Sequence, residues 1–288
     1  MADATGPMSG KTVLITGATS GIGEVAAEEL AKKGARVVLV GRDRARAVAS
    51  AEAIRKASGN PAVEYLLADL SSQAEVRRLA GEIKARYPRL DVLVNNAGAM
   101  FAPRRESVDG IEMTWALNHL AYFLLSELLL DNLKAGAPSR IVNVASDAHR
   151  MVPGIDFDDV EGKKSYKAFR IYGQSKLANI LFTRELARRL DGSGVTANCL
   201  HPGFVATNFT TGKGWLYWSL RQLARVVAIS PEEGAKTTVY LASSPEVEGI
   251  TGGYFAKSKP GKPRAAAWDD EAARRLWDLS EAMTRAPA

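Results

Sequence analysis

The chain has 288 residues, of which 46% are hydrophobic, so it can bury a large core and is not a disordered chain. Its single cysteine, Cys199, excludes an intrachain disulfide and fits a reducing compartment. The formal net charge is +6, but acidic residues are interleaved with the basic ones and no recognition motif accompanies the charge, so we expect no nucleic-acid partner.

The amino-terminal segment has no apolar run of the kind found in signal peptides, and we expect residues 1–10 to be flexible. The longest mainly apolar run, Leu120 to Leu130, is too short to span a bilayer. We therefore expect a soluble, cytoplasmic protein that makes little contact with membranes.

Six short runs rich in β-branched residues alternate with segments of helical period. These runs begin at Thr12, Arg36, Val63, Asp91, Arg140 and Val195. Near-continuous apolar strands separated by helices are typical of a parallel sheet that is covered on both faces. The sequence therefore predicts a single α/β domain over residues 1–288, a doubly wound parallel sheet of Rossmann type. Its C-terminal extension, residues 257–288, is expected to contain a helix.

A glycine-rich stretch, TGATSGIG from Thr16 to Gly23, joins the first strand to a helix. Its glycines permit a tight turn and close approach of the backbone, so the helix N-terminus can hold an anionic pyrophosphate. The alternative is an ordinary glycine-rich turn, but the position between strand and helix favours dinucleotide binding. The predicted cofactor contacts here are Gly17, Thr19, Ser20, Gly21, Ile22 and Gly23.

The end of the second strand indicates which dinucleotide is bound. NAD-selective enzymes usually place an acid there for the ribose 2′-hydroxyl, whereas an arginine accommodates a 2′-phosphate. Gly41 stands at the acid position, and Arg42 and Arg46 can bind phosphate, so we favour NADP(H) over NAD(H). The alternative is that Arg42 is a solvated charge at the start of a helix that Asp43 caps.

Two segments, 147–170 and 204–229, interrupt the alternation after the carboxyl ends of strands, where open α/β sheets bind ligands. We expect residues 204–229 to form a substrate lid over an apolar pocket for lipophilic aldehydes, ketones or alcohols. Alternatively these side chains pack as core, or the stretch around Trp215 lies on a membrane surface. The large side chains are Met151, Phe157, Tyr166, Phe169, Phe204, Trp215, Tyr217 and Trp218.

The stretch RIYGQSKLAN sets Tyr172 and Lys176 four residues apart, on one face of a predicted helix. The ammonium of Lys176 would favour the charged form of the phenol. Tyrosine has an ordinary pKa of about 10 and needs such help to act as an acid and base near neutral pH. Such a pair also arises by chance, so it does not identify a site by itself.

These motifs, with NNAG at Asn95 to Gly98, Ser146 and HPGFVAT at His201 to Thr207, resemble the short-chain dehydrogenase/reductase family over nearly the whole chain. The stretch after Tyr172 and the long interval from Ser146 to Tyr172 resemble its retinol dehydrogenase-like branch. The resemblance implies a catalytic tetrad of Asn118, Ser146, Tyr172 and Lys176. It also implies cofactor contacts from Asp69, Leu70, Asn95, Ala97, Gly98, Tyr172, Lys176, Pro202, Gly203, Val205 and Thr207.

In the family, the tyrosine protonates the substrate oxygen as hydride is transferred and the serine orients that oxygen. The lysine holds the nicotinamide ribose, and the asparagine positions a water that links the lysine to solvent. Some of these residues also have a structural alternative: Asn95 can stabilise the sheet, and Asn118 can be a satisfied polar residue within a helix. Pro202 and Gly203 can simply end a strand.

The resemblance implies an oxidoreductase that forms a homodimer or homotetramer, and the residues at the end of the second strand and in the two interrupting segments add NADP(H) as cofactor and a lipophilic alcohol, aldehyde or ketone as substrate. The alternative is a dinucleotide-sensing interaction protein without chemistry, although the tyrosine, lysine and serine are all present. We expect no metal, because the three histidines lack the spacing of metal ligands. Ser146 also lacks the GxSxG elbow of serine hydrolases.

Overall fold

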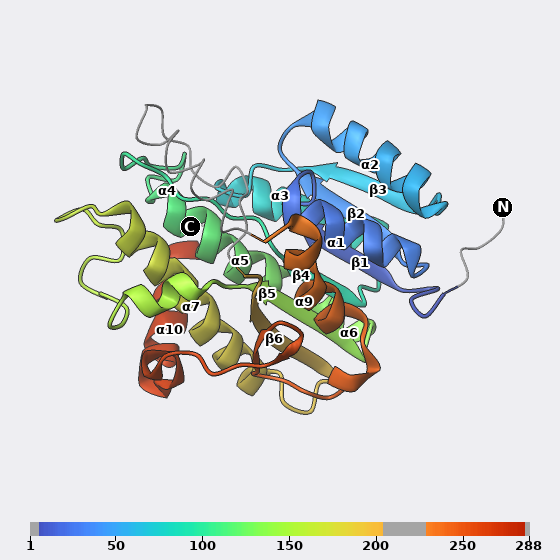
Figure 1. Ribbon diagram of the computed structural model, residues 1–288. Helices are drawn as coiled ribbons and strands as arrows, with labels where there is room; N and C mark the ends of the chain where they lie inside the picture. The colour runs from blue at the N-terminus through green and yellow to red at the C-terminus, as the bar shows by residue number, and fades with distance from the viewer. Residues whose placement is uncertain (1–5, 204–228, 286–288) are drawn as a thin grey trace.

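The computed structural model describes residues 6–203 and 229–285 (Figure 1). One sheet of eight strands forms its centre, in the order β3-β2-β1-β4-β5-β6-β7-β8. Strands β1 to β7 are parallel, and β8 pairs antiparallel with β7. The strands are β1 (Thr12–Thr16), β2 (Arg36–Gly41), β3 (Val63–Leu67), β4 (Val92–Asn95), β5 (Ser139–Val144), β6 (Val195–His201), β7 (Tyr254–Ala256) and β8 (Lys259–Pro260).

Helices cover both faces of this sheet, and Figure 1 shows α1 beside α9 and α7 beside α10. The α-helices are α1 (Gly21–Lys32), α2 (Arg44–Ser58), α3 (Gln73–Arg86), α4 (Met113–Trp115), α5 (Ala121–Leu128), α6 (Leu130–Ala135), α7 (Ala168–Arg189), α9 (Pro231–Ser243) and α10 (Asp270–Thr284). The shorter turns are the π-helical η1 (Ala116–Leu120) and the 3-10 helices η2 (Asp147–Met151), η3 (Pro245–Val247) and η4 (Ala265–Trp268).

Burial on both faces explains the continuous apolar strands. In β1, Val13 and Ile15 pack with α1 and α2, whereas Leu14 packs with α3 and α5 on the opposite face. All three side chains are fully buried. The predicted Rossmann-type fold is confirmed, and the six predicted strands are β1 to β6. The predictions missed β7 and β8, which are too short to show a pattern.

The first and last described segments both pack against the rest of the fold. Residues 6–10, part of the segment expected to be flexible, form a turn in which the Met8 N–H donates to the Lys33 carbonyl at 2.9 Å. The Met8 side chain is buried in the core. At the other end, Trp277 of α10 packs against Phe123 of α5 and Phe182 of α7. Within the described ranges, no helix is long and apolar enough to cross a bilayer.

Candidate active site

The predicted site residues follow the carboxyl ends of β1 to β6, which lie at one edge of the sheet because these strands are parallel. The strand order reverses between β1 and β4, which is where such sheets bind nucleotides. Val205 and Thr207 lie outside the described residues, as do residues 204–228 of the expected lid. The other predicted site residues are all described.

The glycine-rich turn after β1 leaves no room for a side chain at Gly17 or Gly23. Gly17 has φ +66° and Gly21 has φ +57°, the left-handed region that glycine adopts without cost. A Cβ at Gly17 would lie 2.8 Å from Ala97 Cα, and one at Gly23 would lie 2.5 Å from the Gly17 oxygen. The turn therefore packs directly on the chain after β4 and presents a bare backbone at the start of α1.

The N-terminus of α1 also suits an anion. Ser20 precedes α1, but its exposed side chain makes no capping hydrogen bond. The side chains of Asp43, Ser72, Ser230 and Asp269 do cap α2, α3, α9 and α10. The first-turn N–H groups of α1, which include that of Ile22, are thus available to a phosphate. The glycine turn and the uncapped helix together fit a dinucleotide pyrophosphate.

Asn96 holds this turn in place, a residue that the sequence analysis did not single out. Its Nδ2 donates to the carbonyls of Thr16 at 2.9 Å and Gly17 at 3.2 Å. In return, Thr16 Oγ1 accepts from the N–H groups of Asn96 and Ala97, at 2.9 and 3.1 Å. The sequence feature that could have identified Asn96 is its place as the second asparagine of NNAG.

Asn95 points the other way, into the sheet. Its side chain is fully buried and donates to Asn143 Oδ1 at 2.8 Å and Ser126 Oγ at 3.0 Å. The structural alternative therefore describes this side chain, and only the Asn95 backbone can face a cofactor.

The end of β2 is built around a buried glycine. A Cβ at Gly41 would lie 2.6 Å from Thr19 Cγ2, so an acid at this position requires Thr19 to move. Arg42 and Arg46 are exposed next to it, and no ion pair in the described ranges engages either one. Asp43 Oδ1 accepts from the Arg46 N–H at 3.1 Å. Asp43 therefore caps α2, as the alternative interpretation of Arg42 predicted.

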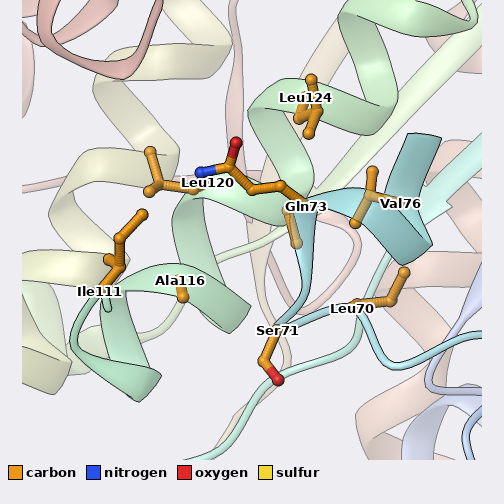
Figure 2. Close-up of a pocket in the computed structure, with 9 residues that line it drawn as sticks. Leu70, Ser71, Gln73, Val76, Ile111, Ala116, Leu120 and Leu124 are labelled. Carbon is orange, nitrogen blue, oxygen red and sulfur yellow. The ribbon is translucent and has the colours of Figure 1, made fainter. Parts of the chain in front are cut away.

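Asp69 and Leu70 follow β3. Asp69 is exposed and its Oδ1 accepts from Ser71 N and Oγ, at 3.0 and 2.7 Å. The Leu70 side chain lines a small, mainly apolar pocket between α3, η1 and α5, whose lining side chains Figure 2 shows. No residue of the predicted tetrad lines this pocket, so it is separate from the predicted catalytic centre.

The tetrad residues come from three neighbouring elements. Ser146 follows β5, Asn118 lies in η1, and Tyr172 and Lys176 lie on α7. Lys176 Nζ donates to the Val144 carbonyl at 2.9 Å and lies 5.7 Å from the centre of the Tyr172 ring. A hydrogen bond also joins Tyr172 to Ser146. The phenol, the hydroxyl and the amine therefore lie together.

Asn118 joins this group to the chain after β4. Its Oδ1 accepts from the Ala99 N–H at 2.9 Å, and its Nδ2 donates to Ser175 Oγ at 3.1 Å. A Cβ at Gly98 would lie 3.1 Å from Asn118 Oδ1 and 3.4 Å from Lys176 Nζ. The predicted Gly98 thus borders the tetrad, because a side chain there would meet Asn118 and Lys176.

Burial sets the protonation of the two central groups. It raises the pKa of the Tyr172 phenol above its ordinary value, although the Ser146 hydrogen bond opposes this. In the protein without its cofactor, the pKa of Tyr172 is therefore raised, whereas the pairing with Lys176 predicted that it would be lowered. Burial also lowers the pKa of the Lys176 amine to about 7. The reason is that both side chains are almost fully enclosed, which penalises their charged forms.

The large side chains of segment 147–170 do not gather in one place. Met151 and Phe169 are 63% and 59% exposed, so they lie at the surface. Arg275 lies 4.3 Å from the centre of the Phe157 ring, and Tyr166 donates to Glu112 Oε1 at 3.1 Å. The core alternative therefore describes Phe157, which packs against the buried cluster that includes Trp115 of α4, Leu181 of α7 and Leu276 of α10.

Pro202 and Gly203 follow β6, and Gly203 has φ +97°. The histidine before them, His201, accepts from the Asp147 N–H at 3.1 Å through Nδ1. In the described part of the chain, no group of three or more histidine, cysteine, aspartate or glutamate side chains is arranged to hold a metal.

Comparison with known proteins agrees with this geometry. Residues 11–214 match the family model described as short chain dehydrogenase. Retinol dehydrogenase 14 of Homo sapiens is 47% identical over 296 residues, covering 96% of this chain and 87% of that protein. Retinol dehydrogenase 13 of Homo sapiens is 43% identical, covering 93% and 82%.

Two solved structures are similar along almost the same length. An uncharacterized protein from Mycobacterium Paratuberculosis has a TM-score of 0.78 and 35% identity, covering 98% of this chain and 96% of that one. A short chain dehydrogenase from Burkholderia cenocepacia J2315, solved in complex with NADP, has a TM-score of 0.69 and 28% identity, covering 86% and 96%. The chain belongs to the short-chain dehydrogenase/reductase family, is similar to its retinol dehydrogenases, and is a nicotinamide-dinucleotide-dependent oxidoreductase of alcohol or carbonyl groups.

Proposed function

We propose that this enzyme uses NADP(H) to interconvert bulky, uncharged, lipophilic alcohols with the corresponding aldehydes or ketones. The observation that carries the cofactor choice is the contact between Gly41 and Thr19, which disfavours the acid of an NAD-selective enzyme. Arg42 and Arg46 are exposed beside it, where guanidinium groups can bind a 2′-phosphate bidentately. The Burkholderia cenocepacia relative with bound NADP supports the same choice.

The tetrad suits proton transfer to a carbonyl oxygen. A bound nicotinamide would supply or accept the hydride. In the reducing direction Tyr172 donates its proton to the substrate oxygen, and the raised pKa keeps the phenol protonated until then. Ser146 donates a hydrogen bond to the same oxygen and orients it beside Tyr172. Lys176 would hold the ribose of a bound nicotinamide, and Asn118 would position a water that links Lys176 to solvent protons.

The substrate class is supported by the relatives and by one exposed side chain. The curated relatives are named retinol dehydrogenases, and retinol is a bulky, uncharged alcohol. Phe169 is 59% exposed and lies three residues before Tyr172, one turn away on the same side of α7. An apolar substrate that reaches Tyr172 can cover this ring, gaining roughly 25 cal/mol for each Å² of apolar surface that it buries.

A chain-length series of aldehydes tests the substrate class. With NADPH, we expect kcat/KM to rise as the aldehyde lengthens, because each added methylene buries more apolar surface. A flat or falling trend, or a preference for anionic sugars or acids, would contradict it.

The assembly and location remain predictions. The resemblance implies pairing through the helices near Asn118 and Lys176, and Trp277 of α10 packs there against Phe123 of α5 and Phe182 of α7. Pairing through this surface would have to displace α10. We propose that the protein is cytoplasmic, and that any homodimer or homotetramer pairs through another surface.

A further inference from the structure

His149 is a fully buried side chain directly behind Ser146, and the chemistry described so far does not use it. Its Nδ1 lies 2.7 Å from the Ser146 carbonyl oxygen, and the Arg264 N–H donates to its Nε2 at 3.2 Å. A carbonyl can only accept and an N–H can only donate, so these partners fix one neutral tautomer, with the proton on Nδ1. Burial also lowers the pKa of His149, which favours this neutral ring.

The hydroxyl and the carbonyl of Ser146 both form hydrogen bonds with the 3-10 helix η2, in which His149 lies. Its Oγ accepts from the Ala148 N–H at 3.2 Å, so this bond fixes where the hydroxyl oxygen sits. Its carbonyl accepts from His149 Nδ1 and also from the His149 N–H at 3.1 Å. The direction of the Ser146 hydroxyl therefore depends on the position of η2.

The C-terminal part of the chain holds η2 from one side. Besides the bond between Arg264 and His149, Arg264 Nη1 donates to the Arg150 carbonyl at 2.6 Å. Tyr254 of β7 donates to Asp147 Oδ1 at 3.2 Å, and its ring meets the His149 ring edge-on with centres 5.5 Å apart. Three residues of η2 thus bond to residues that follow more than 100 positions later.

The helix α7 holds η2 from the other side. A Cβ at Gly173 would lie 2.9 Å from the Ala148 oxygen, so η2 rests directly on the α7 backbone. Gly173 follows Tyr172 in the chain. The contact between η2 and α7 therefore determines the spacing between the Ser146 hydroxyl and the Tyr172 phenol.

We propose that His149 is a positioning residue for Ser146: its Nδ1–H holds the serine carbonyl, and its Nε2 connects that bond to the C-terminal segment through Arg264. This inference rests on the proposed function, because it concerns the serine that orients the substrate oxygen. If His149 only filled the core, its two bonds would satisfy the buried ring nitrogens without placing Ser146, and the loss of kcat in its variants would follow their loss of stability.

Two amide substitutions separate these roles. Asparagine places its Nδ2 near the position of Nδ1, so His149→Asn can still donate to the Ser146 carbonyl but cannot reach Arg264. Glutamine reaches towards Nε2, so His149→Gln keeps the contact with Arg264 and loses the donor to Ser146. Tyr254→Phe is a matched control, because it removes a neighbouring hydrogen bond and leaves both His149 bonds in place.

The measurement is kcat with saturating NADPH and the most rapidly reduced aldehyde, alongside Tm and the Kd for NADPH. We expect His149→Gln to lose about tenfold in kcat, the effect of one lost hydrogen bond, and His149→Asn and Tyr254→Phe to lose clearly less. The Kd for NADPH should be similar in all variants. If His149→Gln is too unstable to purify, His149→Met, which lacks both bonding groups, should show the same loss.

Equal kcat values for the asparagine and glutamine variants, or losses that simply follow Tm, would overturn the positioning role and leave the proposed function intact. Absence of turnover by the wild-type enzyme with every aldehyde would overturn the proposed function, and this inference with it.

Discussion

Thr19 fills the space beside Gly41 that a side chain would need, since a Cβ at Gly41 would lie 2.6 Å from Thr19 Cγ2. The two residues belong to different strand ends, with Thr19 after β1 and Gly41 closing β2. Neither residue alone predicts the contact, because it depends on the pairing of these two strands. The consequence is that the usual acid of NAD-selective enzymes is disfavoured here.

The first prediction concerns Arg42. If its guanidinium binds the 2′-phosphate, Arg42→Ala should lower kcat/KM for NADPH by about tenfold to a hundredfold, the range for a lost hydrogen bond to a charged group. The kcat/KM for NADH should hardly change. Lys56→Ala is the control, because Lys56 is an exposed cation at the far end of α2, the helix that begins just after Arg42. Equal wild-type efficiency with the two cofactors would refute the NADP(H) assignment.

The second prediction concerns the steric contact itself. Gly41→Asp should lower the free energy of unfolding by about 1–3 kcal/mol, because the new Cβ collides with Thr19. Adding Thr19→Ser removes the colliding methyl group and should recover most of that loss. Urea denaturation of the single and double variants measures both values. If Gly41→Asp proved as stable as the wild type, Thr19 would move aside freely.

The third prediction uses two adjacent asparagines with different partners. Asn96→Ala removes the bonds that hold the glycine-rich turn and should weaken NADPH binding. Asn95→Ala leaves Asn143 Oδ1 buried without its donor and should cost about 1–3 kcal/mol of stability with little change in binding. Fluorescence titration with NADPH and thermal melts separate the two effects. Loss of NADPH affinity in the Asn95 variant alone would reverse these assignments.

The fourth prediction concerns His119, which lies next to Asn118. Burial lowers the pKa of His119 to about 3, below its ordinary value of 6.5. Between these values the unfolded chain binds more protons than the folded one, so stability rises with pH in this window. The His119 contribution is fully present above about pH 6.5 and is lost as the pH falls towards 3, with an upper limit of about 5 kcal/mol.

His119→Gln tests this, because glutamine can still reach Ser280, whose Oγ lies 2.7 Å from His119 Nε2. Burial also lowers the pKa values of His149 and His201, so the informative quantity is the difference between the two proteins. The free energy of unfolding of the variant should fall less steeply than that of the wild type between pH 6.5 and 4. Parallel curves would rule out the His119 contribution.

Much of the fold could be predicted because β1 to β6 are buried on both faces and are therefore continuously apolar. Strands β7 and β8 have three and two residues, and no pattern can mark elements so short. The packed turn around Met8 was missed because its hydrogen-bond partner, the Lys33 carbonyl just after α1, is distant in sequence.

The candidate site was predictable where backbone shape dictates the residue, as at Gly17, Gly21 and Gly23. The site was less predictable where the direction of a side chain matters. Asn95 ends β4 and its side chain faces the sheet, whereas Asn96 follows β4 and its side chain faces the glycine-rich turn. In the protein without its cofactor, burial raises the pKa of Tyr172, and that burial depends on the whole fold rather than on the spacing to Lys176.

The central claim is that Tyr172 supplies the proton in an NADPH-dependent reduction. The direct test compares Tyr172→Phe with the wild type, measuring kcat with a long-chain aldehyde and the Kd for NADPH. We expect kcat to fall by about a hundredfold or more, because positioned general acids contribute that much, and the Kd to stay nearly unchanged. Lys176→Ala should impair both quantities, because its amine serves the ribose as well as the proton path. A Tyr172→Phe enzyme that keeps ordinary turnover would contradict the mechanism.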